Sequence, residues 1–210
     1  MAADPNACPF CSLAHDEVLL AHNGDAILLN DRRPLMPGHL LIVSRDHIAS
    51  FADATDGTRR HADDLQARAE EALLRTFGAA ATYEHGRGPM CSSTGTGTGP
   101  IHAHRHVMPI DLDIAGTLVR RGWKDHRATQ TPAPDLHYVE QSLRRRSLRR
   151  VVVATTAESH LIRRLVIDEL RRAGSFAAHA PASAAIDDGT ERIRQHLIVQ
   201  SEPVEKGRGT

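Results

Sequence analysis

The sequence predicts an α+β protein, and three stretches of the chain carry that prediction. Residues 25–30 and 39–44 have the branched apolar side chains of strands, and the turn between them holds two prolines and a glycine. Residues 59–77 place apolar or small side chains at helical spacing, and Gly78 closes that helix. Residues 102–106 alternate histidine with other residues, a spacing that suits a further strand. At 210 residues the chain is one domain, or one domain with a substantial extension.

Composition and charge argue against several classes of partner. The 26 basic and 26 acidic residues cancel, so bulk charge points neither to nucleic acid nor to an anionic membrane. No apolar run approaches the roughly 20 residues of a membrane span, and the first residues lack the basic and apolar regions of a signal peptide. We therefore expect a cytoplasmic protein without nucleic-acid or membrane partners. In that compartment its three cysteines are better explained by metal binding or free thiols than by disulfides.

The C-terminal part of the chain predicts further strands and helices. The helix predicted over 158–173 has apolar residues on one side, and its arginines look like a solvated face: Arg163, Arg164, Arg171 and Arg172. The other expected elements are a strand at 82–86, a helix at 113–123, strands at 136–140 and 149–155, a loop at 175–189 and a short helix at 190–199. We expect a first domain over 1–125, an α/β extension packed on it over 126–201, and a disordered tail over 202–210.

Cys8-Pro9-Phe10-Cys11 is a Cys-x-x-Cys motif, which offers two thiolates to one tetrahedral zinc ion. The motif supplies half of the four ligands, so two more must come from elsewhere in the chain. A redox-active Cys-x-x-Cys is the alternative. That alternative expects a strand before the motif and a long helix after it, whereas only seven mostly polar or small residues precede Cys8. The position of the motif therefore favours zinc.

His102, His104 and His106 stand at alternate positions between two prolines. In an extended strand they share one face, with neighbouring imidazoles about 7 Å apart. Residues 92–99, just before them, are rich in hydroxyl groups and glycine, so their backbone N–H groups and hydroxyls can approach an anion closely. An imidazole nucleophile that faces a phosphate is the functional interpretation. A histidine-rich strand or an adventitious metal site is the alternative that the triad alone leaves open.

These residues resemble the histidine triad (HIT) superfamily of nucleotide hydrolases and transferases, whose motif is His-φ-His-φ-His-φ-φ with φ an apolar residue. Val107 and Met108 complete that motif here. The strand pair upstream resembles the HIT hairpin, in which three short signals recur in order; they are Asn30-Asp31, Pro37-Gly38-His39 and Arg45-Asp46-His47 in this chain. The Cys-Pro-Phe-Cys motif and Glu84-His85-Gly86 are similar to a bacterial branch of the superfamily that also has a C-terminal hairpin and helix.

The resemblance implies a fold and an activity. The fold would be HIT-like, an antiparallel sheet of about five strands with helices packed on one face, often paired as a homodimer. The activity would be that of a nucleoside-phosphate hydrolase, which cleaves dinucleoside polyphosphates or nucleoside phosphoramidates at the α-phosphate through a covalent nucleotidyl-histidine. The alternatives are a nucleotidyltransferase or phosphorylase with the same intermediate, and a nucleotide-binding regulatory module with little turnover. Transferases of the superfamily commonly have glutamine at the third triad position, so His106 favours the hydrolase.

The resemblance also assigns roles to individual residues. Asn30 and Asp31 would bind substrate, Asp31 through the ribose hydroxyls, while Ile27 and Leu29 would line the base pocket. His104 would attack the α-phosphorus, and its second ring nitrogen would donate a proton to a backbone carbonyl. The remaining assignments are catalytic roles for His106 and His39, and contacts to phosphate or leaving group from Thr98, Gly99 and His85. A structural role is the alternative for His85, because it precedes a glycine at a turn.

The two missing zinc ligands also follow from the resemblance. HIT-like galactose-1-phosphate uridylyltransferases bind a structural zinc ion with a Cys-x-x-Cys motif, a distant histidine and the first histidine of the triad. The matching residues here are Cys8, Cys11, His47 and His102. His104, about 7 Å from His102, would be too far away to share an ion bound at about 2 Å. The ion would orient the strand without activating the phosphate.

Two features depart from the family pattern. Arg105 occupies a slot that should be apolar, and in a strand it points away from the histidines. We therefore expect that face of the strand to be exposed to solvent or to meet an acidic partner. Thr98, Gly99 and Pro100 replace the glutamine or serine that usually precedes the triad.

Overall fold

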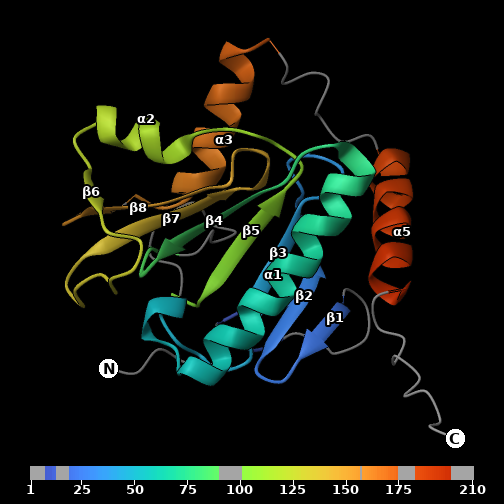
Figure 1. Cartoon of the computed structure of the whole chain (residues 1–210), viewed down its shortest axis with the longest axis horizontal. Coiled ribbons are helices and arrows are strands. Elements are labelled where there is room, and N and C mark those ends of the chain that lie inside the picture. Colours follow the sequence, from blue (N-terminus) through green and yellow to red (C-terminus); the bar gives the residue numbers. More distant parts are fainter. Residues whose placement is uncertain (1–7, 13–18, 90–100, 157, 175–182, 200–210) are drawn as a thin grey trace, which may run out of the picture.

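An eight-stranded antiparallel sheet forms the centre of the protein (Figure 1). The structure is a computed structural model that describes residues 8–12, 19–89, 101–156, 158–174 and 183–199. The strands lie in the order β1-β2-β3-β5-β4-β7-β8-β6. Their bounds are β1 Leu19–Asn23, β2 Ala26–Asn30, β3 Leu40–Ser44, β4 Ala81–Gly86, β5 His104–Met108, β6 Lys124–His126, β7 His137–Leu143 and β8 Leu148–Ala154. The expectation of about five strands was wrong, because the strands after residue 125 continue the same sheet and because β1 and β6 were missed.

Helices cover both faces of this sheet, which corrects the expectation of helices on one face. Helix α1 (Asp56–Phe77) packs on β1, β2, β3 and β5, and α5 (Ser183–Val199) packs on α1 (Figure 1). Helices α2 (Ile114–Arg120) and α3 (Leu161–Arg172) pack on β4, β7 and β8, and their buried side chains form a second core on the opposite face. Two single-turn 3-10 helices, η2 (Phe51–Asp53) and η3 (Arg144–Arg146), complete the structure over the described residues.

Helix α1 is long because its sequence supplies both ends and a continuous apolar stripe. The Thr55 hydroxyl accepts the backbone N–H of Thr58 at the first turn, and Gly78 ends the helix with a positive φ of 78°. Leu65 and Leu73 lie on the buried stripe, with no exposed surface. The helix predicted over 59–77 is thus confirmed, although it begins earlier. The last helix is longer than predicted, because residues 183–189 are helical and not a loop; residues 175–182 and the predicted tail over 202–210 lie outside the described residues.

The hairpin of β2 and β3 brings Asp31 and His39 together at one end of the sheet. Asn30 pairs with Leu40 across the two strands, and the backbone N–H of Asp31 donates to the His39 carbonyl over 3.1 Å. Gly38 turns the chain into β3 with a φ of 80°, and a Cβ at this position would lie 2.7 Å from the Phe77 ring. Glycine is therefore required just before His39, both for the backbone angle and for contact with α1.

Strand β5 lies between β3 and β4, and its alternation sends Arg105 to the face that carries α1. Arg105 is 3% exposed, and its guanidinium lies 2.6 Å from Asp63 and 3.4 Å from the buried carboxylate of Glu84. Burial raises the pKa of Glu84, and the charge of Arg105 opposes that rise. Of the two expectations for this face, the acidic partner is correct and lies within the chain.

No helix in the described part of the chain is long and apolar enough to cross a membrane.

We predict that Arg105→Leu destabilises the protein by about 3–5 kcal/mol, because it leaves the buried Glu84 carboxylate without a counter-charge. Urea unfolding followed by circular dichroism measures the effect. Arg75→Leu is the control: Arg75 pairs with Glu71 on the surface of α1, so its loss should cost less than about 1 kcal/mol. Equal losses in the two variants would show that the Arg105 network does not stabilise the core.

Candidate metal site and histidine site

The face of the sheet opposite α1 carries an apolar patch beside two histidines. Leu29, Leu41 and Val43 are buried there, and Phe10 and Ile27 pack against them. The register of β3 with β5 sets His104 beside Val43 and His106 beside Leu41. The predicted base-pocket residues therefore lie on β2, next to β3, and β3 in turn pairs with β5, the strand of the triad. The Cys-x-x-Cys segment contributes Phe10 to the same patch.

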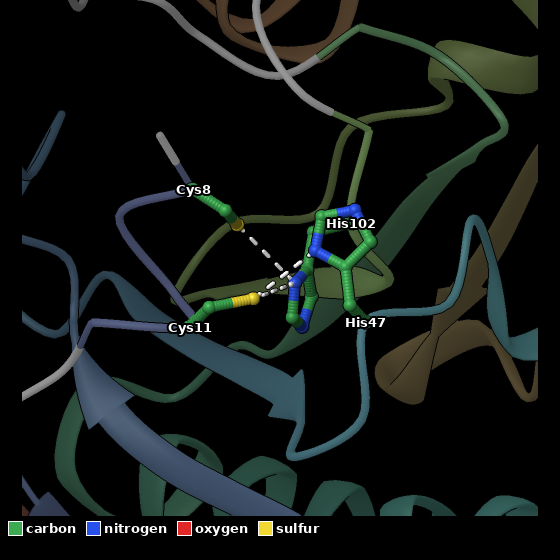
Figure 2. A group of neighbouring side chains, drawn as sticks. All are labelled: Cys8, Cys11, His47 and His102. Carbon is green, nitrogen blue, oxygen red and sulfur yellow. Dashed lines mark hydrogen bonds between the residues drawn. The ribbon is translucent and has the colours of Figure 1, made fainter. Parts of the chain in front are cut away.

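Cys8, Cys11, His47 and His102 come together from three separate stretches of the chain (Figure 2). Their sulfur and nitrogen atoms all lie within 4.8 Å of one another. The Cys8 and Cys11 sulfurs lie 3.4 and 3.7 Å from His102 Nδ1, and Cys11 Sγ lies 3.0 Å from His47 Nδ1. Figure 2 shows the two thiols pointing at the two rings. These four residues could bind one metal ion.

The spacing of these atoms fits a tetrahedral ion. With metal–sulfur bonds of about 2.3 Å and metal–nitrogen bonds of about 2.0–2.1 Å, tetrahedral geometry sets sulfur and nitrogen ligands about 3.6 Å apart. His102 Nε2 lies 2.8 Å from the Ser44 carbonyl and 3.1 Å from its hydroxyl, whose own hydrogen goes to the Asp46 carbonyl. His102 Nε2 is therefore the protonated nitrogen, and Nδ1 presents a lone pair to the cluster. Such a second hydrogen bond is what metal-bound histidines usually make.

The redox interpretation of the Cys-x-x-Cys motif fits this setting poorly. Burial and the neighbouring Cys8 thiol raise the pKa of Cys11 to about 11. Reactive thiols have a lowered pKa, because the thiolate is the attacking species. Burial also lowers the pKa of His102 to about 4, so its ring is neutral near pH 7 and able to bind a metal.

His104 holds its proton on the nitrogen that faces the backbone. Its Nδ1 lies 2.8 Å from the His102 carbonyl oxygen, which can only accept, so Nδ1 donates. The Nε2 atom of the neutral ring then carries the lone pair. Burial lowers the pKa of His104, which keeps the ring neutral near pH 7. This is the protonation state that an attacking imidazole needs.

A chain of hydrogen bonds gives His106 the opposite tautomer. The backbone N–H of Leu35 donates to His39 Nδ1 over 3.1 Å, so His39 carries its proton on Nε2. That Nε2 lies 2.9 Å from His106 Nδ1 and donates to it, which leaves the His106 proton on Nε2. Burial lowers the pKa of His39 to about 4 and lowers that of His106 well below its usual value. The two triad histidines are thus an acceptor and a donor side by side, with ring centroids 5.1 Å apart.

Asp31, His39 and His106 form a second close group of metal-ligating side chains. A metal bound there would need a lone pair on His39 Nε2, which lies 3.4 Å from Asp31 Oδ2. That nitrogen holds the proton, because Nδ1 accepts the Leu35 N–H. This group is therefore a hydrogen-bonded relay, and the four-residue cluster around Cys8 is the better metal site.

Asp31 is paired with an arginine that the sequence analysis placed in solvent. Arg163 Nη1 lies 2.8 Å from Asp31 Oδ2, and Arg163 also donates to the Arg33 carbonyl. Its side chain is 18% exposed and that of Asp31 is 10% exposed. The second carboxylate oxygen of Asp31 accepts the backbone N–H of Arg33. The solvated interpretation of Arg163 was wrong, although Arg164 and Arg172 do lie on the exposed side of α3.

His85 lies beside His104 on the same face of the sheet. Tyr83 pairs with His106 across β4 and β5, so His85, two residues further along β4, reaches the level of His104. Its ring is 9% exposed, and burial lowers its pKa to about 3. Thr98 and Gly99, which the sequence analysis assigned to phosphate binding, lie outside the described residues.

Three residues of this site escaped the sequence analysis. Phe10 packs against the rings of His102 and His104, with centroids 5.5 and 5.4 Å away. Its place inside the Cys-x-x-Cys motif was the available signal. Ser44 orients His102, and no local pattern marks it. Arg163 stands three residues before Val166 and seven before Leu170, along the edge of the buried stripe of α3; an arginine on that stripe was a signal for a buried partner.

No protein-family model and no curated protein matches this sequence. Its fold is similar to those of solved structures, among them the following three. A Hit-like protein involved in cell-cycle regulation from Bartonella henselae is 12% identical, with a TM-score of 0.41 and 85% of each chain covered. A hypothetical histidine triad nucleotide-binding protein from Sulfolobus tokodaii is 11% identical, with a TM-score of 0.48 over 97% of this chain and 100% of that one. A hypothetical protein from Leishmania major is 20% identical, with a TM-score of 0.41 over 58% of this chain and 93% of that one. At these values no residue's role is transferred, and the assignment of the site rests on its geometry.

The hydrogen bonds predict a distinct tautomer for His104. Long-range proton–nitrogen NMR spectra of the labelled protein near pH 7 should show the proton of His104 on Nδ1, and the protons of His39, His102 and His106 on Nε2. Each assignment follows from the acceptor or donor that the other ring nitrogen meets. An Nε2–H pattern for His104 would contradict the geometry derived above.

Proposed function

We propose that this protein is a nucleoside-phosphate hydrolase that cleaves its substrate at the α-phosphate through a nucleotidyl-histidine intermediate on His104. The observation that carries the proposal is the pair of opposite tautomers on β5, a lone pair on His104 Nε2 beside a proton on His106 Nε2. Nucleophilic displacement at phosphorus needs an attacking lone pair and a proton for the leaving group. We also propose that the chain is a HIT protein, with a HIT domain over residues 1–125 and an extension over 126–201.

The reaction has two steps. His104 Nε2 attacks the α-phosphorus, and the bond from phosphorus to the leaving oxygen or nitrogen breaks. The leaving group takes the Nε2 proton of His106, which His39 can support through its own Nε2–H. The positive charge that develops on the His104 ring is stabilised by the His102 carbonyl, to which Nδ1–H already donates. Water then attacks the phosphorus, and the phosphorus–nitrogen bond breaks to leave neutral His104 with its Nε2 lone pair. The proton that the water loses returns to His106 Nε2, and the nucleoside monophosphate is released.

The rest of the site suggests how a nucleotide would lie. The apolar patch of Phe10, Ile27, Leu29, Leu41 and Val43 suits a base. Asn30 and Asp31, at the end of β2, would face the ribose, since the ionised Asp31 can accept further hydrogen bonds beyond those from Arg33 and Arg163. Thr98 and Gly99 remain assigned to the non-bridging phosphate oxygens, and His85 to the phosphate or leaving group.

We further propose that Cys8, Cys11, His47 and His102 bind a structural zinc ion. Two thiolates and two neutral imidazoles form a closed, neutral tetrahedral site. A zinc ion here would fix the start of β5 through His102, whose carbonyl holds His104 in its reactive tautomer. Because all four ligands are protein atoms, the ion would have no open position for substrate.

The zinc assignment predicts about one zinc ion per chain in purified protein, measured by elemental analysis. Cys8→Ser combined with Cys11→Ser should abolish zinc binding, and a chelator should lower the melting temperature of the wild type, because metal binding contributes folding free energy. Cys91→Ser is the control and should retain the metal. Full zinc content in the double variant would refute this ligand set.

The mechanism predicts that His104→Ala abolishes turnover while the fold, the metal and nucleotide binding persist. His106→Ala should lower the rate by about 10²–10⁴-fold, because it removes proton transfer and leaves the nucleophile. The measurement is product analysis with a dinucleoside polyphosphate and a nucleoside phosphoramidate, plus mass spectrometry of protein quenched in alkali, which should carry a nucleotidyl group on the His104 peptide. His22→Ala, which changes an exposed histidine on β1, is the control. Wild-type activity in His104→Ala would disprove the mechanism, and tight binding without any product would favour a regulatory module.

A further inference from the structure

The first turn of α3 lies over the triad and closes a small cavity there. The cavity is lined by His104 and His106 of β5, His85 of β4, Gly88 and Pro89, and the α3 stretch from His160 to Arg163. Its volume is about 10 Å³, which is room for about one water molecule. The extension therefore contributes directly to the surroundings of the histidines, and α3 has more than a packing role.

One unpaired polar atom lines this cavity, and another lies at the start of α3. His85 is nine-tenths buried, and its Nε2 atom meets no partner in the described part of the chain. Ser159, immediately before α3, has a buried hydroxyl that is likewise unpaired among the described residues. No side chain caps the N-terminus of α3, where His160 adopts a left-handed conformation. Buried polar groups are nearly always satisfied in folded proteins, so the unpaired His85 Nε2 in this cavity, beside an uncapped helix N-terminus, points to a ligand.

The charge of this region selects an anion. The N-terminus of a helix carries partial positive charge, and its free N–H groups bind phosphate well. Arg163 donates hydrogen bonds to Asp31 and to the Arg33 carbonyl. A guanidinium has five N–H groups, so these two bonds do not use all of them. Arg163 forms an ion pair with Asp31, so the negative charge of this carboxylate is neutralised.

The position of α3 shows which phosphate group would bind. Strands β2 and β3, with the apolar patch, lie on one side of β5, whereas β4 and His85 lie on the other. Helix α3 packs on β4, and its Arg163 reaches Asp31 at the end of β2. A nucleotide with its base on the patch and its α-phosphate over His104 would direct the next phosphate toward α3. Resting on the proposed function, we propose that the first turn of α3, with Arg163 and His85, is a binding subsite for a phosphate group next to the α-phosphate.

The present cavity is too small for a phosphate group, so binding requires this turn of α3 to move outward or Arg163 to turn from Asp31 toward the ligand. The phosphate can come from two sources. It is the leaving phosphate of a dinucleoside polyphosphate, or free inorganic phosphate that takes the nucleotide from His104.

Two substrates with the same nucleotide separate the subsite from the rest of the reaction. A dinucleoside polyphosphate places a phosphate in the subsite, and a nucleoside phosphoramidate with an uncharged amine does not. Arg163→Gln should lower kcat/KM for the polyphosphate by about 10–100-fold more than for the phosphoramidate, the range expected for charged hydrogen bonds. Arg164→Gln is the matched control, because Arg164 follows on the same turn but pairs with the exposed Glu158, and it should change neither value.

A structural role through Asp31 makes a different prediction. If Arg163 only docks α3 on Asp31, then Asp31→Asn should cause the same loss for both substrates, and Arg163→Gln should add no substrate preference in the Asp31→Asn background. A preference that survives in that background supports the subsite, and its disappearance overturns it. With the phosphoramidate as substrate, nucleoside diphosphate formed on addition of inorganic phosphate identifies phosphate as the acceptor. Nucleoside monophosphate as the sole nucleotide product identifies the leaving phosphate as the group that binds in the subsite.

Binding of pyrophosphate tests the subsite without catalysis. Pyrophosphate should raise the melting temperature of the wild type and of Arg164→Gln, and should raise that of Arg163→Gln much less. If the wild type turns over neither substrate but this pattern holds, the proposed hydrolase activity fails and the subsite stands. If both substrates are hydrolysed but pyrophosphate protects Arg163→Gln as well as the wild type, the subsite is disproved and the hydrolase stands.

Discussion

The pleat of β5 is the constraint on which the rest of the site depends. Alternate residues of a strand point to opposite faces, so His104 and His106 must lie on one side of the sheet and Arg105 on the other. The two faces need different surroundings. On one, Arg105 is held in a dry interior by carboxylates under α1; on the other, neutral imidazoles meet an apolar patch and a helix N-terminus. A shift of one residue in the pairing of β5 would exchange these surroundings and bury the wrong charge on each side.

Hydrogen bonds to the backbone, continued from His39 to His106, decide the tautomer of each histidine. The Ser44 carbonyl, the His102 carbonyl and the Leu35 N–H each meet one ring nitrogen, and each thereby fixes the state of the other nitrogen. One residue type, placed at four positions near one another, thus presents a free lone pair on Nδ1 in His102, a free lone pair on Nε2 in His104, and a proton on Nε2 in His39 and His106. These distinctions are properties of the folded chain, since the side chains are chemically identical.

The sequence predicts the local structure of this protein well, and it predicts contacts between residues far apart in the chain poorly. The hairpin over 25–44, helix α1 and the four clustered metal-site residues follow from short motifs, spacing and the stated resemblance. The small strand β1 was missed although Asn23-Gly24 is a strong hairpin signal, because only five residues precede that turn in the strand. The predicted number of strands was wrong because β7 pairs with β4 across a long separation in the chain, and β8 then pairs with β7 in the same sheet. The contact of Arg163 with Asp31 spans 132 positions, and no local pattern encodes which partner an arginine on a helix will meet.

Phe10 lies inside the metal-binding motif and yet touches the ring of the proposed nucleophile and the proposed base patch. The binding free energies of the proposed metal ion and the proposed nucleotide would consequently be linked. Whatever holds Cys8 and Cys11 in place also holds Phe10, so an ion in that site should favour the nucleotide-bound state. Linkage is reciprocal for binding, so a bound nucleotide should slow or weaken the loss of the ion to a chelator by the same coupling. Metal supply would then set nucleotide affinity, although the ion never touches the nucleotide.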